Sequence, residues 1–351
     1  MTSKVKTYQR FLVAFCLGIL LCLLLGANPV GGVNAILGFS HPQSMAIDST
    51  KTKSENKQNQ DRLFLPDSIP YPNGIAVTSD GSMFVGSVTT GAVAKIDPQN
   101  LETKLLVAPQ TAIIASTSLR ADEARGVLWA CSPDVFPTNG TSSRKPSSLV
   151  EFDLNDGTVI RTVELPQDGF CNDLAIDDRG GVLVTDSFNP RILYLPPDKL
   201  EFEVWAQDER FGVADGFGLA GIAIAPDGTV YVGVFANGQL YRIRQQKVEP
   251  LQLTRKIDNP DGIAIAPNGG LIVCEGNYQS GNGRLLQIDL LGTDGLTGDI
   301  KVLAEGLDSP VNLSLHDKTA WVTEGRLRGL LFPELNLPQP GSFWVRLIPL
   351  L

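Results

Sequence analysis

Six times along the chain, a short apolar run, a pair of turn residues and a second apolar run follow one another. The clearest copies are "PNGIAVTSDGSMFVGS" from Pro72 and "PDGIAIAPNGGLIVCEG" from Pro260. Each apolar run has the length of a strand, and the Asp-Gly or Asn-Gly pair accepts the positive φ that a tight hairpin requires. The first positions of the six copies, 41 to 54 residues apart, are Asn73, Ser118, Asn172, Ala220, Asp261 and Val311.

A third and a fourth apolar run usually complete each unit, such as "QLYRIR" and "VEPLQL" after the copy that includes Ala220. Four strands in each repeat are typical of a propeller blade, so the sequence predicts an all-β fold, a six-bladed β-propeller of four-stranded antiparallel blades. An open β-solenoid is the alternative. Closure of the ring is expected in the last blade, where "RLFLP" (62–66) would supply the outer strand beside a strand from "SFWVRLIPL" (342–350).

The residues before the repeat divide into two segments. Lys4, Lys6 and Arg10 precede the apolar run 11–27, and Val33 and Ala35 are small residues that suit a cleavage site. Residues 1–35 are therefore predicted to be a signal peptide, and an uncleaved membrane anchor is the alternative. Residues 36–61 are predicted to be a flexible tether and residues 62–351 the propeller. On this interpretation the protein is exported, either periplasmic or secreted, and touches a membrane only through an uncleaved leader.

Charge and cysteine content narrow the range of partners and sites. The chain has 38 acidic and 29 basic residues, for a net charge of -9, which argues against nucleic acid as a partner. Three cysteines lie beyond the predicted leader: Cys131, Cys171 and Cys274. Their odd number and wide spacing fit neither a disulfide framework nor a paired-cysteine zinc site. We therefore expect three buried thiols.

Propeller geometry would gather distant oxygen donors at one mouth. The first strand of each blade lines the central channel, and the second strand runs back to the same rim, so all six first positions, among them Asn73, Asn172 and Asp261, are predicted to meet there. The further donors expected at this mouth, in contact with substrate, are Asp173, Asp186, Glu275 and Glu324. Carboxylate and amide oxygens are hard ligands that suit Ca²⁺, Mg²⁺ or Mn²⁺. With only two histidines in the chain, a His-based catalytic triad is hard to build.

Turn formation is the alternative role for these aspartates and asparagines, because such residues before a strand often bond their own backbone. Asp80, Asp227 and Asn268 lie beside the glycine of a hairpin and are predicted to be turn formers only. For the first positions of the repeats, convergence at one mouth favours ligand binding.

Two copies carry a resemblance to a known family. The segments "CNDLAIDDRGGVLVTDS" and "NPDGIAIAPNGGLIVCEG" resemble the Asn-Asp and Pro-Asp-Gly blades of the senescence marker protein/gluconolactonase family of six-bladed propellers. The resemblance extends over residues 72–325, and strictosidine-synthase-like, paraoxonase-like and NHL-repeat propellers have similar segments. It implies a divalent cation held by a Glu, an Asn and an Asp, and the hydrolysis of lactones or related esters.

Carried over by position, the resemblance implies that Asp261 binds the metal and acts as general base. It also implies that Asn172 and Asp173 lie beside the metal and the substrate. Two positions depart from the family pattern, because Asn73 stands where the Glu ligand is expected and Ala220 where the Asn ligand is expected. The metal site that follows is atypical and consists of Asp261, Asn172 and Asn73, with Ca²⁺ or another divalent cation such as Mg²⁺ or Mn²⁺.

The sequence leaves three functions open. The first is a divalent-cation-dependent hydrolase that takes a small lactone or ester at the channel mouth. The second is a non-catalytic propeller that binds a small molecule or a protein, which Ala220 favours. The third is a metal-free enzyme of the strictosidine-synthase kind, with Glu275 or Glu324 as its acid/base. All three share one fold, so the fold alone does not choose among them.

Overall fold

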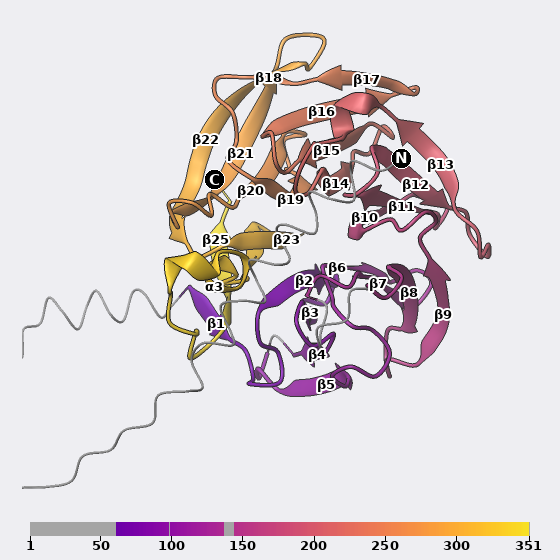
Figure 1. Ribbon diagram of the computed structural model, residues 1–351, viewed down its shortest axis with the longest axis vertical. Coiled ribbons are helices and arrows are strands. Elements are labelled where there is room, and N and C mark those ends of the chain that lie inside the picture. Colours follow the sequence, from indigo (N-terminus) through magenta and orange to yellow (C-terminus); the bar gives the residue numbers. More distant parts are fainter. Residues whose placement is uncertain (1–60, 98, 137–143, 351) are drawn as a thin grey trace, which may run out of the picture. The chain divides into compact units, whose positions relative to one another are not determined.

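The computed structural model describes residues 61–97, 99–136 and 144–350. The repeated units form six mainly antiparallel sheets arranged in a ring (Figure 1). Each inner strand contacts the inner strands of both neighbouring sheets, including the first sheet and the last. The prediction of a six-bladed β-propeller is therefore confirmed. The predicted leader and most of the predicted tether lie outside the described residues.

Four strands in sequence order make up each of the first four blades. Blades 1 and 2 consist of β2 (Pro72–Val77), β3 (Met83–Ser87), β4 (Val93–Ile96) and β5 (Thr103–Val107), then β6 (Ser118–Asp122), β7 (Val127–Ser132), β8 (Ser148–Asp153) and β9 (Val159–Glu164). Blades 3 and 4 consist of β10 (Cys171–Ile176), β11 (Val182–Asp186), β12 (Arg191–Leu195) and β13 (Glu203–Gln207), then β14 (Leu219–Ile224), β15 (Val230–Val234), β16 (Gln239–Arg244) and β17 (Lys247–Pro250).

The last two blades depart from this plan. Blade 5 contains β19 (Pro260–Ile265), β20 (Leu271–Glu275), β21 (Gly283–Leu291) and β22 (Thr297–Leu307), and the short β18 (Gln252–Leu253) pairs with β22 in parallel. Blade 6 contains β23 (Pro310–His316), β24 (Thr319–Glu324), β25 (Trp344–Pro349) and β1 (Arg62–Phe64). Strand β1 pairs antiparallel with β25, so the two ends of the propeller close the ring as predicted.

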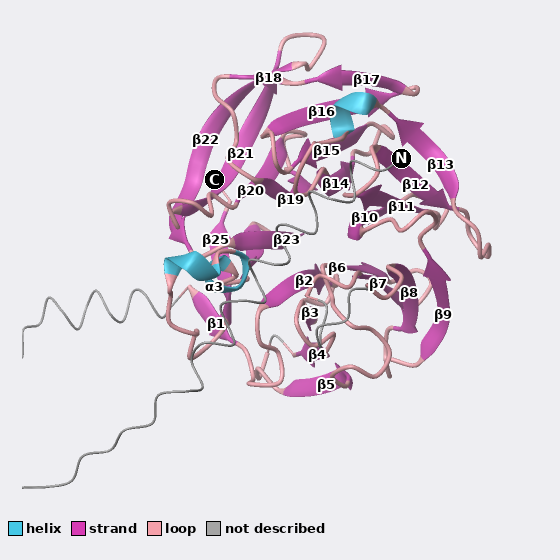
Figure 2. Cartoon of the chain, in the orientation of Figure 1, coloured by secondary structure: helices cyan, strands magenta, loops and turns pink. Residues whose placement is uncertain are grey.

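Strands form almost all of the regular structure (Figure 2). In the part of the chain that the structure describes, the helices are η2 (Glu209–Phe211), α3 (Arg328–Leu331) and η3 (Pro333–Leu335). None of the described helices is long and apolar enough to cross a membrane.

The hydrophobic core lies between the blades. Each of six apolar clusters joins the facing surfaces of two neighbouring sheets, as where Phe84 of blade 1 packs in the same cluster as Leu128 and Phe152 of blade 2. Because both faces of every sheet are buried in this way, the sequences of the inner strands are nearly continuous apolar runs. A seventh apolar cluster, which includes Tyr71, Tyr278 and Leu327, lies at the mouth.

The hairpin turns follow the sequence prediction. Oδ1 of Asp80 accepts a hydrogen bond from the backbone N–H of Ser82 at 2.9 Å, and Oδ1 of Asp227 accepts one from Thr229 at 3.0 Å. Asn268 binds the N–H of Gly270 in the same way at 3.0 Å. These side chains are occupied by their own turns, so their predicted role as turn formers is confirmed.

The prediction of three buried thiols is wrong for two of the cysteines. Cys131 of β7 and Cys171 of β10 form a disulfide between blades 2 and 3, with their Cα atoms 5.2 Å apart. The pair was missed because 40 residues separate the two cysteines in sequence, whereas the ring brings their strands together. Cys274 is a buried free thiol, as predicted.

Reduction of this disulfide is expected to lower the free energy of unfolding by about 2–4 kcal/mol, because the unfolded chain regains the freedom that the cross-link removes. Urea denaturation with and without dithiothreitol measures the change. The variant Cys274→Ala should respond to the reductant as the wild type does. An unchanged urea midpoint for the reduced wild type would contradict this prediction.

Candidate functional site

Strand irregularities position the three predicted metal ligands. The pairing of β2 with β3, of β10 with β11 and of β19 with β20 shifts register at the start of the inner strand. Asn73, Asn172 and Asp261 lie within these three shifts. A bulge bends the strand and redirects the side chains next to it. The same shift occurs around Ala220 in blade 4 and around Val311 in blade 6, so the bulge is a shared feature of five inner strands and does not by itself single out the three ligands.

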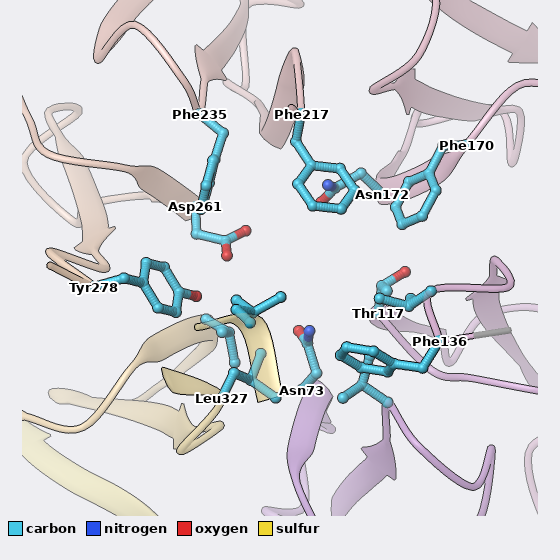
Figure 3. A pocket seen from close by; sticks show the side chains of 14 residues that line it. Asn73, Thr117, Phe136, Phe170, Asn172, Phe217, Phe235, Asp261, Tyr278 and Leu327 are labelled. Carbon is cyan, nitrogen blue, oxygen red and sulfur yellow. The ribbon is translucent and has the colours of Figure 1, made fainter. Parts of the chain in front are cut away.

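A pocket at this mouth brings the three residues together. The space between its walls, counted together with the solvent at its open side, is about 490 Å³. Asn73, Asn172 and Asp261 all line it, with Thr117 as a further polar residue. Figure 3 shows the Asp261 carboxylate and the Asn73 carboxamide directed into the space between blades. Of the six first positions expected at one mouth, these three and Val311 line the pocket, whereas Ser118 and Ala220 do not.

Asp261 is the single carboxylate among the described residues that line the pocket. It is partly exposed there, and within the described residues no hydrogen bond or salt bridge to its carboxylate is found. Although part of the residue is exposed, its carboxylate loses much of its water in the pocket, which raises the pKa of Asp261 well above its usual range, and the negative charge of Asp173 raises it further. An ionised Asp261 is thus left without a countercharge from the described part of the protein.

The two asparagines differ in how much of their amide is free. Nδ2 of Asn172 donates to Oγ of Ser187 at 2.8 Å, which leaves its Oδ1 available to a ligand. No hydrogen bond of the Asn73 carboxamide is found among the described residues, although its backbone carbonyl accepts from Thr323. Asn73 can therefore offer both an acceptor and a donor to a ligand.

Glycines allow the inner strands to approach closely enough to form this site. A Cβ atom at Gly221 would lie 2.0 Å from the carbonyl oxygen of Asp261, and one at Gly262 would lie 2.7 Å from Cα of Asn312. Such contacts are impossible without a shift of the backbone. Glycine after the first position of these blades is therefore a packing requirement that fixes where Asp261 stands.

Asp173, which was expected to contact substrate, lies outside the pocket lining and is 1% exposed. Its carboxylate accepts hydrogen bonds from Arg120 at 3.1 Å and from the backbone N–H of Ile222, also at 3.1 Å. Oγ of Ser118 donates to it as well. Asp173 thereby joins the inner strands of blades 2, 3 and 4 beneath the mouth, and its charge reaches Asp261 only through space.

The other three carboxylates expected at the substrate end their second strands as predicted, but none lines the pocket. Each accepts the backbone N–H of the loop that leads into the inner strand of its own blade. The donors are Phe170 for Asp186 at 2.9 Å, Asp258 for Glu275 at 2.9 Å and Asp308 for Glu324 at 2.6 Å. Arginines neutralise them: Arg191 for Asp186, Arg255 and Arg284 for Glu275, and Arg346 for Glu324.

In blades 1 and 2, the last residue of the second strand also forms a hydrogen bond with the loop that leads into the inner strand. Oγ of Ser87 donates to the carbonyl of Pro70, and Oγ of Ser132 accepts from the N–H of Ile114 at 3.1 Å. In five blades, a polar residue at the end of the second strand thus forms a hydrogen bond with the backbone of the loop that leads into the inner strand. This arrangement does not bring Asp186, Glu275 or Glu324 together with Asp261.

Sequence reasoning missed the apolar wall of the pocket and the arginine beneath it. Phe136, Phe170, Phe217, Phe235 and Tyr278 line the pocket, and all come from loops at the mouth (Figure 3). The available signal was their place in the repeat, since aromatic residues flank inner strands in blades 3 and 4. Arg120 had a clearer signal, because a cation inside an inner strand must face either the channel or the core.

The residues at the mouth fit a divalent cation as ligands. Asp261 directs into the pocket a carboxylate that no described residue pairs with, and the two asparagines add amide oxygens, all of them hard donors. Within the described residues there is no cluster of three or more His, Cys, Asp or Glu side chains that could hold a metal. A cation here would therefore depend on one charged ligand, and Ca²⁺ would need water to complete its six to eight oxygens.

No protein-family model and no curated protein matches the sequence. Among solved structures, a gluconolactonase from Xanthomonas campestris is similar, with a TM-score of 0.56, 16% identity and coverage of 82% of this chain and 89% of that one. Regucalcin from Agrobacterium tumefaciens, a calcium-binding protein, gives a TM-score of 0.58 at 14% identity, with 83% and 95% covered.

A PQQ-bound aldose sugar dehydrogenase from Streptomyces coelicolor is similar to the same extent, with a TM-score of 0.57, 13% identity and 82% and 97% covered. A gluconolactonase, a calcium-binding protein and an aldose sugar dehydrogenase thus share this architecture, so the function must be argued from the site. The chain has the six-bladed propeller fold of the gluconolactonase-like and regucalcin-like structures.

Proposed function

We propose that the mouth pocket binds small lactones or related esters and hydrolyses them with the help of a divalent cation. The observation that carries this proposal is the carboxylate of Asp261, which has no partner among the described residues, in a pocket where two amide oxygens likewise have none. A general base works best when its pKa lies near the working pH, and without a cation desolvation raises the pKa of Asp261 above the usual aspartate range. The fold shared with a gluconolactonase is consistent with this activity.

Three groups of the chain would act on the substrate. Asp261 takes a proton from the water that attacks the ester carbon and returns it to the alkoxide oxygen when the acyl C–O bond breaks, and the Asn73 carboxamide can donate a hydrogen bond to the carbonyl oxygen. The apolar walls limit access of bulk water and hold the rest of the substrate. A divalent cation held by Asp261, Asn172 and Asn73 would supply Lewis-acid polarisation of the carbonyl. Acid release from a panel of δ-lactones in Ca²⁺ buffer tests the activity.

Addition of 10 mM Ca²⁺ is expected to raise the melting temperature by roughly 3–8 °C, because a ligand bound only by the folded state stabilises that state by mass action. Differential scanning calorimetry before and after EDTA measures the shift. Mg²⁺ and Mn²⁺ in the same assay rank the candidate cations.

Two variants sharpen this test. Asp261→Asn removes the charged ligand and should abolish the shift, whereas Asp227→Asn changes a turn residue outside the pocket lining and should retain it. If none of the three cations changes the melting temperature of the wild type, the proposed cation site is contradicted.

Binding without turnover is a second candidate function, and Ala220 favours it. At the position of an expected Asn ligand, Ala220 offers only a methyl group, and its carbonyl already accepts a hydrogen bond from Thr185 at 2.6 Å. The lone carboxylate in an aromatic pocket would then pair with an organic ammonium group rather than a metal. A ligand that binds while no lactone or ester is turned over would support this function.

We also propose that the protein is exported and that its partner is a small molecule. The Cys131–Cys171 disulfide supports export, because such bonds persist in oxidising compartments. The apolar leader sequence supports it as well. Fractionation of cells that express the full chain tests the location, and recovery only in the cytosol with reduced cysteines would contradict it.

A further inference from the structure

Six aromatic rings form a continuous arc along one side of the mouth. Successive ring centroids lie 4.9 to 6.5 Å apart, within the range of favourable aromatic contacts. In order of contact, the rings belong to Phe188, Phe170, Phe217, Phe235, Tyr278 and Phe332. They come from the loops of blades 3, 4, 5 and 6, so four separate parts of the repeat contribute to one surface.

The middle of this aromatic arc faces the pocket. Phe170, Phe217, Phe235 and Tyr278 line it, and Phe136 lines the opposite wall (Figure 3). Phe170 and Tyr278 are each 3% exposed and therefore fixed in place by packing. Phe217 is partly exposed and can present its ring to a ligand.

Polar groups in the pocket are few, and some are already engaged. Thr117 donates its hydroxyl to the carbonyl of Cys171 at 3.0 Å, and Asn172 uses its Nδ2 on Ser187. Asn73, Asp261 and the remaining oxygen of Asn172 are needed for the reacting end of the substrate. A sugar lactone would bring a hydroxyl on nearly every ring carbon into an apolar wall, and buried hydroxyls without partners are unfavourable.

We propose that the pocket selects lactones or esters whose non-reacting part is aromatic, and that the aromatic arc packs against that part. This inference rests on the proposed function only for the orientation of the ester group toward Asp261. The selectivity arises because Phe217 and its neighbours bury an apolar ring that water solvates poorly, while they offer nothing to a polyol.

Two non-hydrolysable δ-lactams test the selectivity without any reaction. Dihydroquinolinone carries a fused aromatic ring, whereas gluconolactam carries hydroxyls on the same six-membered ring, and calorimetric titration measures the Kd of each. We expect dihydroquinolinone to bind about 100-fold more tightly. Phe217→Ser should weaken its binding by about 10-fold, and Phe217→Leu, which keeps an apolar side chain, by less than about threefold.

The outcomes separate this inference from the proposed function. Equal or tighter binding of gluconolactam, or no binding of dihydroquinolinone to a folded wild type, would overturn the inference. Equal affinity of the serine and leucine variants, both with wild-type circular dichroism, would overturn the role of the aromatic arc. Tight binding of dihydroquinolinone with no hydrolysis of the corresponding lactone, dihydrocoumarin, would support the inference and refute only the hydrolase.

Discussion

Asp261→Asn is expected to lower kcat/KM for δ-lactone hydrolysis by about 10²–10⁴-fold, the usual contribution of a general base. The amide keeps the shape of the side chain but neither accepts a proton at neutral pH nor brings charge to a cation. Initial rates of acid release from dihydrocoumarin, with wild type and variant at equal concentration, measure the loss.

The same substitution should stabilise the fold in the absence of a cation. Burial raises the pKa of Asp261, so the folded state holds the proton more tightly than the unfolded state does. The wild type therefore loses stability as the pH rises from the usual aspartate range through the raised pKa, and the Asp261→Asn variant would avoid this loss. Urea denaturation at several pH values in EDTA measures the difference. Full activity in the variant, with no gain in stability, would show that Asp261 is an ordinary surface aspartate.

Glu324→Ala is expected to lower the free energy of unfolding by about 3–5 kcal/mol, the usual cost of removing one partner from a buried ion pair. Glu324 is 1% exposed, accepts a hydrogen bond from Nε1 of Trp344 at 2.6 Å and pairs with Arg346 at 3.2 Å. Both partners belong to β25, the strand that closes the ring with β1. Urea denaturation followed by Trp fluorescence measures the change.

Two controls define the cause of this loss. Glu324→Gln keeps an oxygen for Trp344 and the backbone of Asp308, so it should lose less stability than alanine does. Glu334 lies in the exposed η3, so Glu334→Ala should leave the free energy of unfolding unchanged. If Glu324→Ala unfolds at the wild-type urea concentration, the carboxylate does not hold the closing strand.

The propeller fold was predictable because the sequence pattern of each blade is contained in one short stretch of the chain. Each unit repeats apolar runs and turn residues within about 50 residues, and Asp80 and Asp227 make their turns with neighbours two positions away. The convergence of Asn73, Asn172 and Asp261 followed from one geometric rule, that equivalent positions of a closed ring share a rim. The rule needs no knowledge of side-chain contacts, and it placed all three in the pocket.

Roles that depend on partners distant in sequence were not predictable in this way. Asp173 was expected at the substrate, but Arg120 lies 53 residues away in another blade and pairs with it. The disulfide was missed for the same reason, because Cys131 and Cys171 meet only across the seam between two blades. The aromatic arc is built from loop residues, which lie outside the apolar runs that define the repeat, so only their position beside the inner strands could have indicated it.

Turnover of dihydrocoumarin by the wild-type protein tests the central claim most directly. Initial rates of acid release are measured in Ca²⁺, after EDTA, and after Ca²⁺ is restored, with Asp261→Asn as the reference for uncatalysed hydrolysis. The proposed site predicts turnover in Ca²⁺ that falls to the reference rate in EDTA and returns when Ca²⁺ is restored. Wild-type rates equal to those of Asp261→Asn under all three conditions would contradict the claim that this pocket is a hydrolase active site.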